Sequence, residues 1–204
     1  AGSESLLGTP GFPFWSPDSQ HLGYFANGQL MRISIAGGAP SVVCVAEAGE
    51  GGAWFQAAGE EGVIVFAPAA VGPLHRVPAR GGLSTAVTKL ASGETGHVFP
   101  QFLPDGRLLY STRGDKGKVW IEKLGTDDRH LVMEAETRAV YSHPGLLLYT
   151  RDDVLLAHRF NLDTLALEGE PVAVAQNVRS AAAVRRNAFS VSATGVLVYR
   201  GGTS

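Results

Sequence analysis

The residues that could do chemistry in this chain are charged groups gathered in a few short segments. Arginine, aspartate and lysine occur together at residues 113–116, and arginine and two aspartates at 151–153. Further charges lie at 94–97, 134–138 and 179–186. Such mixed groups recognise a partner through ion pairs and charge-assisted hydrogen bonds. The residues that we expect to form a binding face are His97, Arg113, Asp115, Lys116, Arg138, Arg151, Asp152, Arg185 and Arg186.

Side chains at the fixed spacings of known catalytic motifs are missing from the sequence. It has no Gly-x-Ser-x-Gly elbow, no phosphate-cradling Gly-Lys-Ser/Thr loop, no His-Glu-x-x-His and no kinase catalytic-loop motif. The six histidines stand at no helical or hairpin ligand spacing, which leaves only a metal site assembled from distant segments. We therefore expect no enzyme activity, no catalytic residue, no metal and no cofactor in this chain.

A few other conspicuous residues are expected to have structural roles. Asp18 and Asp105 each follow a proline, in Ser-Pro-Asp and Leu-Pro-Asp-Gly, where a carboxylate accepts a backbone N–H and shapes a turn. Trp15 and Trp54 fall on expected strands and favour the core over an exposed stacking platform. Cys44, the only cysteine, stands in an apolar run, which predicts a buried and unreactive thiol.

The composition sets the class of protein. The chain has 204 residues, with 17 Lys and Arg against 19 Asp and Glu, so no basic excess draws it to nucleic acid or to an anionic membrane. Its 26 glycines and 11 prolines, together with 45% hydrophobic residues, are typical of a folded, turn-rich protein. No apolar run is long enough to span a bilayer, and we expect no direct membrane insertion by this chain.

An internal repeat sets the arrangement of the elements that must position the charged groups. Short apolar runs carry an aromatic residue at intervals of 41, 44, 39 and 50 residues: Phe25, Phe66, Tyr110, Tyr149 and Tyr199. Residues 30–38 and 74–82 match at Leu, at Arg and at a Gly-Gly pair. A period near 40–45 residues with four short apolar runs is typical of a four-stranded propeller blade.

The repeat therefore predicts an all-β fold, a β-propeller of four-stranded antiparallel blades with about four and a half blades in this chain. We interpret residues 1–204 as one propeller domain or a propeller fragment. The approximate blades are residues 11–50, 51–96, 97–137 and 138–179, with a half blade at 180–204. One hypothesis closes the ring as five blades, with residues 5–7 adding a strand to the half blade. Its rival is that the chain is half of a longer propeller, which alone is open or self-associates through its free blade edges.

Two turn motifs carry a family resemblance. Residues 15–19, Trp-Ser-Pro-Asp-Ser, and residues 102–106, Phe-Leu-Pro-Asp-Gly, resemble the repeat of TolB-like β-propellers. The order of five segments is similar to the C-terminal propeller region of some bacterial serine/threonine protein kinases: residues 12–38, 72–82, 99–107, 167–175 and 189–200. The second unit departs from the pattern, with Phe-Gln-Ala-Ala-Gly at 55–59 where the Ser-Pro-Asp turn is expected.

This resemblance implies a bacterial, non-catalytic binding or sensing module of a larger signalling protein such as a receptor kinase. The kinase domain itself is not in the sequence. An extracytoplasmic place as part of a membrane receptor follows from the resemblance alone. We expect a protein, peptide or small-molecule ligand at the loop face and no nucleic acid. The alternatives are a propeller that accompanies a peptidase and a TolB-like partner-binding protein of the cell envelope.

Overall fold

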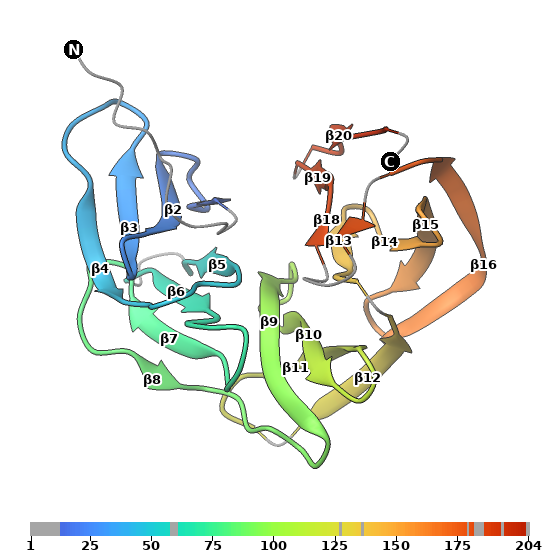
Figure 1. Ribbon diagram of the computed structural model, residues 1–204, viewed down its shortest axis with the longest axis horizontal. Helices are drawn as coiled ribbons and strands as arrows, with labels where there is room; N and C mark the ends of the chain where they lie inside the picture. The colour runs from blue at the N-terminus through green and yellow to red at the C-terminus, as the bar shows by residue number, and fades with distance from the viewer. Residues whose placement is uncertain are drawn as a thin grey trace. The chain divides into compact units, whose positions relative to one another are not determined.

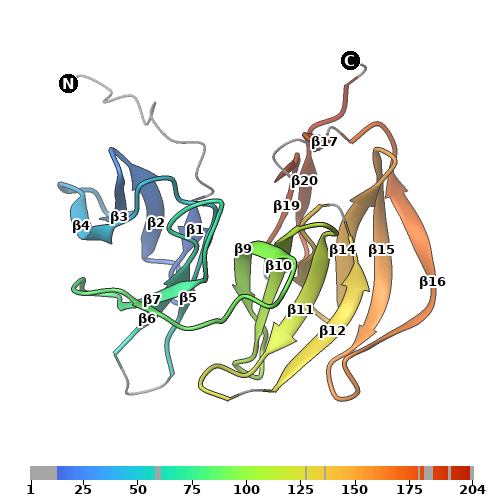
Figure 2. The ribbon, with the colours of Figure 1, turned by 60° about the horizontal axis from the view of Figure 1, so that its bottom comes forward.

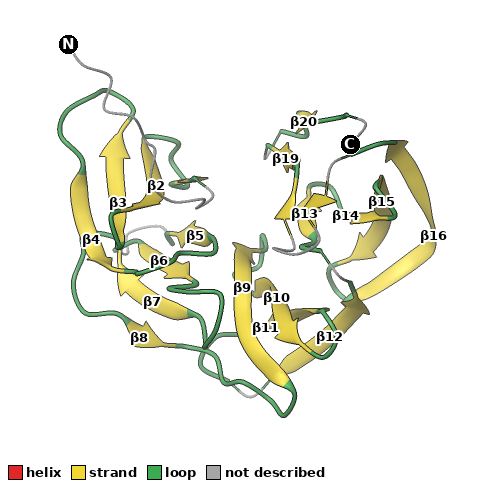
Figure 3. Ribbon diagram, viewed as in Figure 1, coloured by secondary structure: helices red, strands yellow, loops and turns green. Residues whose placement is uncertain are grey.

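The computed structural model describes residues 13–57, 61–126, 128–135, 137–178, 180–181, 186–192 and 194–202. Strands and turns make up this part of the chain, and Figure 3 shows no helix in it. The all-β prediction is therefore confirmed. The chain divides into two compact units, residues 1–106 and 107–204, which are described separately (Figure 1). The hypothesis that residues 5–7 close a ring lies outside the described residues.

Unit 1, residues 1–106, contains two sheets in which consecutive strands are antiparallel neighbours. The first has the order β1-β2-β3-β4, with β1 Phe14–Trp15, β2 His21–Ala26, β3 Gln29–Ser34 and β4 Ser41–Val45. The second has the order β5-β6-β7-β8, with β5 Gly52–Phe55, β6 Val63–Phe66, β7 His75–Pro78 and β8 Thr85–Ala86. The long strand β9, Glu94–Phe102, completes this unit.

Unit 2, residues 107–204, holds the remaining strands. In the third sheet, β10 Leu108–Gly114, β11 Lys118–Glu122 and β12 Arg129–Glu134 are antiparallel neighbours in this order. The fourth has the order β13-β14-β15-β16, with β13 Val140–Ser142, β14 Leu146–Arg151, β15 Val154–Asn161 and β16 Ala166–Ala175. Two strand pairs follow, β17 Ser180–Ala181 with β18 Arg186–Asn187, and β19 Phe189–Val191 with β20 Leu197–Tyr199. The sheets thus recur with the period predicted from the sequence.

The predicted turns form through local side-chain and backbone chemistry. Between β2 and β3, Asn27 and Gly28 have φ of 52° and 72°, which gives the tight turn that suits the twist of a hairpin. In the Ser-Pro-Asp turn, the Asp18 carboxylate accepts the Ser16 hydroxyl and, at 3.0 Å, the Gln20 N–H. These bonds to the charged form lower the pKa of Asp18 below its usual value. Asp18 is therefore a turn former, as predicted.

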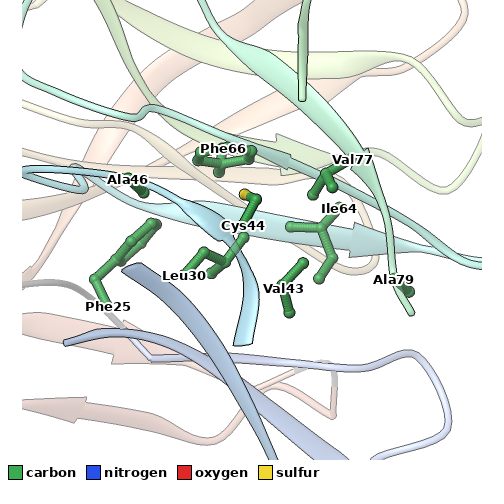
Figure 4. Close-up of a cluster of buried hydrophobic side chains, with 9 residues drawn as sticks. All are labelled: Phe25, Leu30, Val43, Cys44, Ala46, Ile64, Phe66, Val77 and Ala79. Atoms are coloured by element: carbon green, nitrogen blue, oxygen red, sulfur yellow. The ribbon is translucent and has the colours of Figure 1, made fainter. Parts of the chain in front are cut away.

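The core of unit 1 lies between its two sheets. Figure 4 shows nine buried side chains contributed by strands of both sheets and by the residues that follow β4 and β7. The aromatic residues Phe25 and Phe66 of the repeat belong to this cluster, and their ring centroids are 6.3 Å apart. Burying apolar area of this kind is the main stabilising contribution to folding, at about 25 cal/mol per Å².

Cys44 and Trp54 lie at the core of unit 1, as expected, whereas Trp15 does not. Cys44 lies in the same buried cluster, so the prediction of a buried thiol is confirmed, and burial raises its pKa to about 11. Trp54 packs against the cluster, as predicted. Trp15 does not, because the short strand β1 leaves its side chain 55% exposed. The prediction of a core position was wrong for this tryptophan.

The described residues hold no helix that is long and apolar enough to cross a membrane.

Candidate functional site

The turn between β14 and β15 carries Arg151 and Asp152, two of the predicted binding residues. Arg151 and Val154 face each other across the hairpin, so the turn has only two central residues. These are Asp152 and Asp153, with φ of 50° and 58°, a left-handed conformation that short polar side chains tolerate better than most. Arg151 lies with its guanidinium carbon 5.7 Å from the centre of the Tyr149 ring. A tight turn therefore presents an exposed cation and an exposed anion side by side.

The turn between β10 and β11 carries Asp115 and Lys116, which are both exposed. Lys116 Nζ lies 3.6 Å from Glu134 Oε2, and both side chains are largely in solvent. An exposed pair of this kind contributes only about 0–1 kcal/mol, so a partner can compete for Lys116. Arg113, which precedes the turn, is half-buried. Figure 2 shows the β10–β11 and β14–β15 turns at the same, upper end of unit 2.

Arg138 has a structural position in unit 2. Its Nη2 donates a hydrogen bond of 2.7 Å to the carbonyl oxygen of Phe189, and its guanidinium carbon lies 5.6 Å from the centre of that ring. Burial lowers the pKa of Arg138 to about 10, which leaves it charged at neutral pH. The side chain joins the segment before β13 to β19, so we leave Arg138 out of the surface available to a partner.

His97 is fully buried in unit 1, so it too is absent from the exposed surface. Its Nδ1 lies 2.8 Å from Thr88 Oγ1, and its Nε2 lies 3.0 Å from Glu94 Oε2. The neutral tautomer with the proton on Nε2 satisfies both contacts, because Nε2–H donates to the carboxylate and Nδ1 accepts the hydroxyl proton. The N–H groups of Leu74 and Ala91 complete the network by donating to Thr88 Oγ1 and Glu94 Oε2.

A hydroxyl, an imidazole and a carboxylate in this order are also the components of a nucleophilic relay. Here Thr88 is 4% exposed, and its oxygen already accepts the Leu74 N–H at 2.9 Å. The network therefore holds the segment between β8 and β9 against β9. Nothing in the spacing of residues 88, 94 and 97 marks this contact in the sequence, because it requires the two segments to lie side by side.

The last two predicted residues cannot be placed on the surface. Arg185 lies outside the described residues, and the structure places only the backbone of Arg186, in β18. Within the part of the chain that the structure describes, no group of three or more His, Cys, Asp or Glu side chains could hold a metal ion. The structure therefore brings Arg113, Asp115, Lys116, Arg151 and Asp152 to one end of unit 2. We call these five residues the unit 2 loop surface.

Sequence reasoning missed a set of arginines that reach from one sheet to the next within a unit. In unit 1, Arg32 Nη1 donates to the Ala79 carbonyl at 3.0 Å. In unit 2, Arg107 Nη2 donates to the Leu162 carbonyl, and Arg138 makes the equivalent bond to Phe189. The sequence shows that an arginine recurs at the position of Arg32, because segments 30–38 and 74–82 match there. It does not show that Arg32 bonds to a carbonyl 47 residues away.

Comparison with known proteins shows the fold. No family model and no curated protein matches the chain. Among solved structures, regucalcin from Agrobacterium tumefaciens C58, described as a calcium-binding protein, matches with a TM-score of 0.65 and 15% identity over 95% of this chain and 67% of its own. TolB from Acinetobacter baumannii matches with a TM-score of 0.58 and 15% identity over 76% of this chain and 41% of its own. The fold is that of a β-propeller.

A third similar structure corrects one expectation. A luciferin-regenerating enzyme matches with a TM-score of 0.63 and 12% identity, over 92% of this chain and 67% of its own length. Identities this low establish the fold only. Since the same propeller fold carries an enzyme, the missing motifs do not establish that the chain lacks activity, and the expectation of a non-enzyme is withdrawn. This chain spans two thirds or less of the length of these neighbours.

Proposed function

We propose that this chain is a protein-binding propeller module whose unit 2 loop surface contacts the partner. The observation that carries the proposal is the pair of short hairpin turns at one end of unit 2, which expose charges of both signs. Short turns on a rigid sheet hold such groups in fixed positions, which lowers the entropy lost on binding. The likeness to TolB structures supports a protein as the partner.

The charges on the loop surface define the chemistry of that partner. Arg151 and Asp152 lie next to each other in one turn, and Asp115 and Lys116 do so in the other. A partner that complements them carries both an acidic and a basic group at short spacing, and it binds less well as salt screens these contacts. A polyanion such as nucleic acid is disfavoured, because each cation here has an anionic neighbour.

The wider role is a further part of the proposal. The blade order that resembles the C-terminal propeller of bacterial serine/threonine kinases supports a sensing module of a bacterial receptor kinase. In that role a ligand signals by favouring one arrangement of the propeller over another. A second candidate, a TolB-like partner-binding protein of the cell envelope, is favoured by the fold likeness to TolB. Sequencing the native reading frame upstream of residue 1 separates the two, since a kinase domain there supports only the first.

Charge reversal on the loop surface tests the binding role. The double variant Arg151→Glu, Lys116→Glu should lose cross-linked partners that the wild-type chain captures from extracts of the source organism. The matched control is Arg80→Glu, because Arg80 is an exposed arginine of unit 1 that pairs with Glu61 at 3.0 Å. We expect the control to capture the same proteins as the wild type. Equal capture by the double variant would remove the loop surface as the binding site.

A further inference from the structure

The turn between β2 and β3 contains a dipeptide that occurs once in this chain. Of the asparagines at positions 27, 161, 177 and 187, only Asn27 is followed by glycine. The other three precede Leu162, Val178 and Ala188. The side-chain amide of an asparagine reacts with the backbone nitrogen of the next residue, and glycine has no side chain to hinder the approach. The turn of Asn27 and Gly28 is therefore the position in this chain that favours such chemistry most.

Both reacting groups are accessible in the structure. Asn27 is exposed, and neither its amide nor the Gly28 N–H is held in a hydrogen bond among the residues that the structure describes. A side chain built on Gly28 would meet no atom within 4 Å, so the space around this residue is open. The amide of Asn27 is thus available to the nitrogen of Gly28.

Two of the other asparagines lack this freedom. The Asn161 oxygen accepts two backbone N–H groups at 2.9 and 3.2 Å, and its nitrogen donates to Glu168 at 2.8 Å. After Asn177 it is the attacking nitrogen that is held, because the Val178 N–H donates to a backbone carbonyl at 2.8 Å. Val178 is also fully buried and branched at Cβ. The chain therefore contains its own comparison for Asn27.

We propose that Asn27 is a site of spontaneous deamidation. The Gly28 backbone nitrogen loses its proton and attacks Cγ of Asn27, so that a new N–C bond forms. The amide C–N bond of the side chain breaks, and ammonia leaves with the proton. Water then opens the cyclic imide at either carbonyl, which leaves aspartate or isoaspartate at residue 27. Water enters and ammonia leaves, so the step needs no oxidant, reductant or enzyme. This inference does not depend on the unit 2 loop surface.

The closed turn limits the rate of the reaction. Ala26 and Gln29 pair across the hairpin, and Asn27 and Gly28 between them have φ of 52° and 72°. The Gly28 carbonyl also accepts the Ala46 N–H at 2.9 Å, which ties the turn to the end of β4. Attack requires rotation about the Cα–C bond of Asn27, and both contacts resist that rotation. The reaction therefore proceeds through molecules whose turn has opened locally, and it is slower in the folded chain than in the unfolded chain.

The two products have different effects on the hairpin. Aspartate leaves the backbone unchanged and tolerates the left-handed conformation, so the turn remains. Isoaspartate carries the chain through its side-chain carbonyl and adds one methylene to the backbone, which no longer fits a two-residue turn. The next pair of the hairpin, Phe25 and Leu30, and the tethered Ala46 belong to the buried cluster of unit 1 (Figure 4). Isoaspartate at residue 27 therefore loosens the core beside the turn.

Peptide mapping of incubated protein tests the proposal. The tryptic peptide that ends at Arg32 contains Asn27 and no other asparagine, whereas the peptides 160–179 and 187–200 contain the other three. In folded wild-type protein at mildly alkaline pH, the first peptide should gain about 1 Da through loss of the amide. It should do so about tenfold or more faster than the other two peptides, because only its asparagine precedes glycine. The conversion should be faster at higher pH and faster in urea.

Two variants at the same position are matched controls. Asn27→Gly removes the amide but keeps a residue that suits the turn, so its peptide should keep its mass. Asn27→Asp is the product with the normal backbone and should unfold at the same urea concentration as fresh wild-type protein. Incubated wild-type protein should contain a fraction that unfolds at lower urea than Asn27→Asp, and isoaspartate should be concentrated in that fraction.

Three results would overturn the inference. The first is an Asn27 amide that remains intact in folded protein after an incubation that fully converts it in the unfolded chain. The second is conversion of the other asparagines at the same rate as Asn27. The third is an isoaspartate fraction that unfolds together with Asn27→Asp, since the added methylene would then leave the hairpin undisturbed.

Discussion

Strands β14 and β20 contain the same sequence motif and differ in burial. In both, three aliphatic residues precede a tyrosine and an arginine follows one or two positions later, at residues 146–151 and 196–200. In β14 the middle four residues are buried, since β13 and β15 flank the strand and its sheet packs on the next pair of strands. In β20 the corresponding side chains are largely exposed. The motif encodes a strand, whereas its burial depends on the strands and sheets that lie beside it.

Truncating the two tyrosines should separate these environments most strongly. Tyr149→Ala removes a 2% exposed ring and leaves a cavity, so we expect a loss of about 3–5 kcal/mol in the free energy of unfolding. Tyr199→Ala removes a half-exposed ring and should cost about 1 kcal/mol or less in dilute protein. Urea unfolding at micromolar concentration measures both. Equal losses would show that the two strands do not differ in the way described here.

The histidines extend the comparison from strands to single residues. His97→Ala should cost about 2–3 kcal/mol, because it leaves the buried Thr88 hydroxyl and Glu94 carboxylate without the imidazole. His130→Ala, at an exposed histidine of β12, should change stability by about 0.5 kcal/mol or less. Thermal unfolding of the two variants, measured side by side, checks this difference. A similar small effect for both would mean that the His97 network contributes little.

The arginines should show a smaller difference of the same kind. Arg138→Ala removes a charged hydrogen bond to the Phe189 carbonyl and should cost about 1.5–3 kcal/mol. Arg138→Lys should recover only part of this, since a lysine lacks the planar fork that reaches the carbonyl while covering the ring. Arg151→Ala should change stability by about 0.5 kcal/mol or less, because Arg151 lies in an exposed turn. Denaturant midpoints of the three variants give the comparison.

Local sequence features predicted much of the fold. The period of the aromatic residues predicted the sheets, and the Ser-Pro-Asp sequence predicted the turn that Asp18 forms. The end of β8 at Ala86 is not a local feature of the sequence. Beyond that point the Thr88 hydroxyl oxygen accepts the Leu74 N–H and contacts His97 Nδ1, and the strand does not continue. Such long-range side-chain bonds cannot be read from local pattern.

The candidate site was predictable to the extent that it is local. Charges in two-residue to four-residue turns indicated Asp115, Lys116, Arg151 and Asp152, and all four are exposed. Arg138 and His97 are polar side chains like those in the turns, but they are held by contacts with distant segments that no local rule predicts. The acceptor of Arg138 is 51 residues away, and His97 becomes buried only when β9 packs beside the segment after β8.

Hydrogen exchange tests the contrast between β14 and β20 most directly. Amides of residues 146–151 should be protected, because β14 has a neighbouring strand on each side. Amides of Leu197 and Tyr199 should exchange faster, because β20 has one neighbouring strand, β19, among the described residues. Equal protection of the two strands would contradict the difference in environment described here.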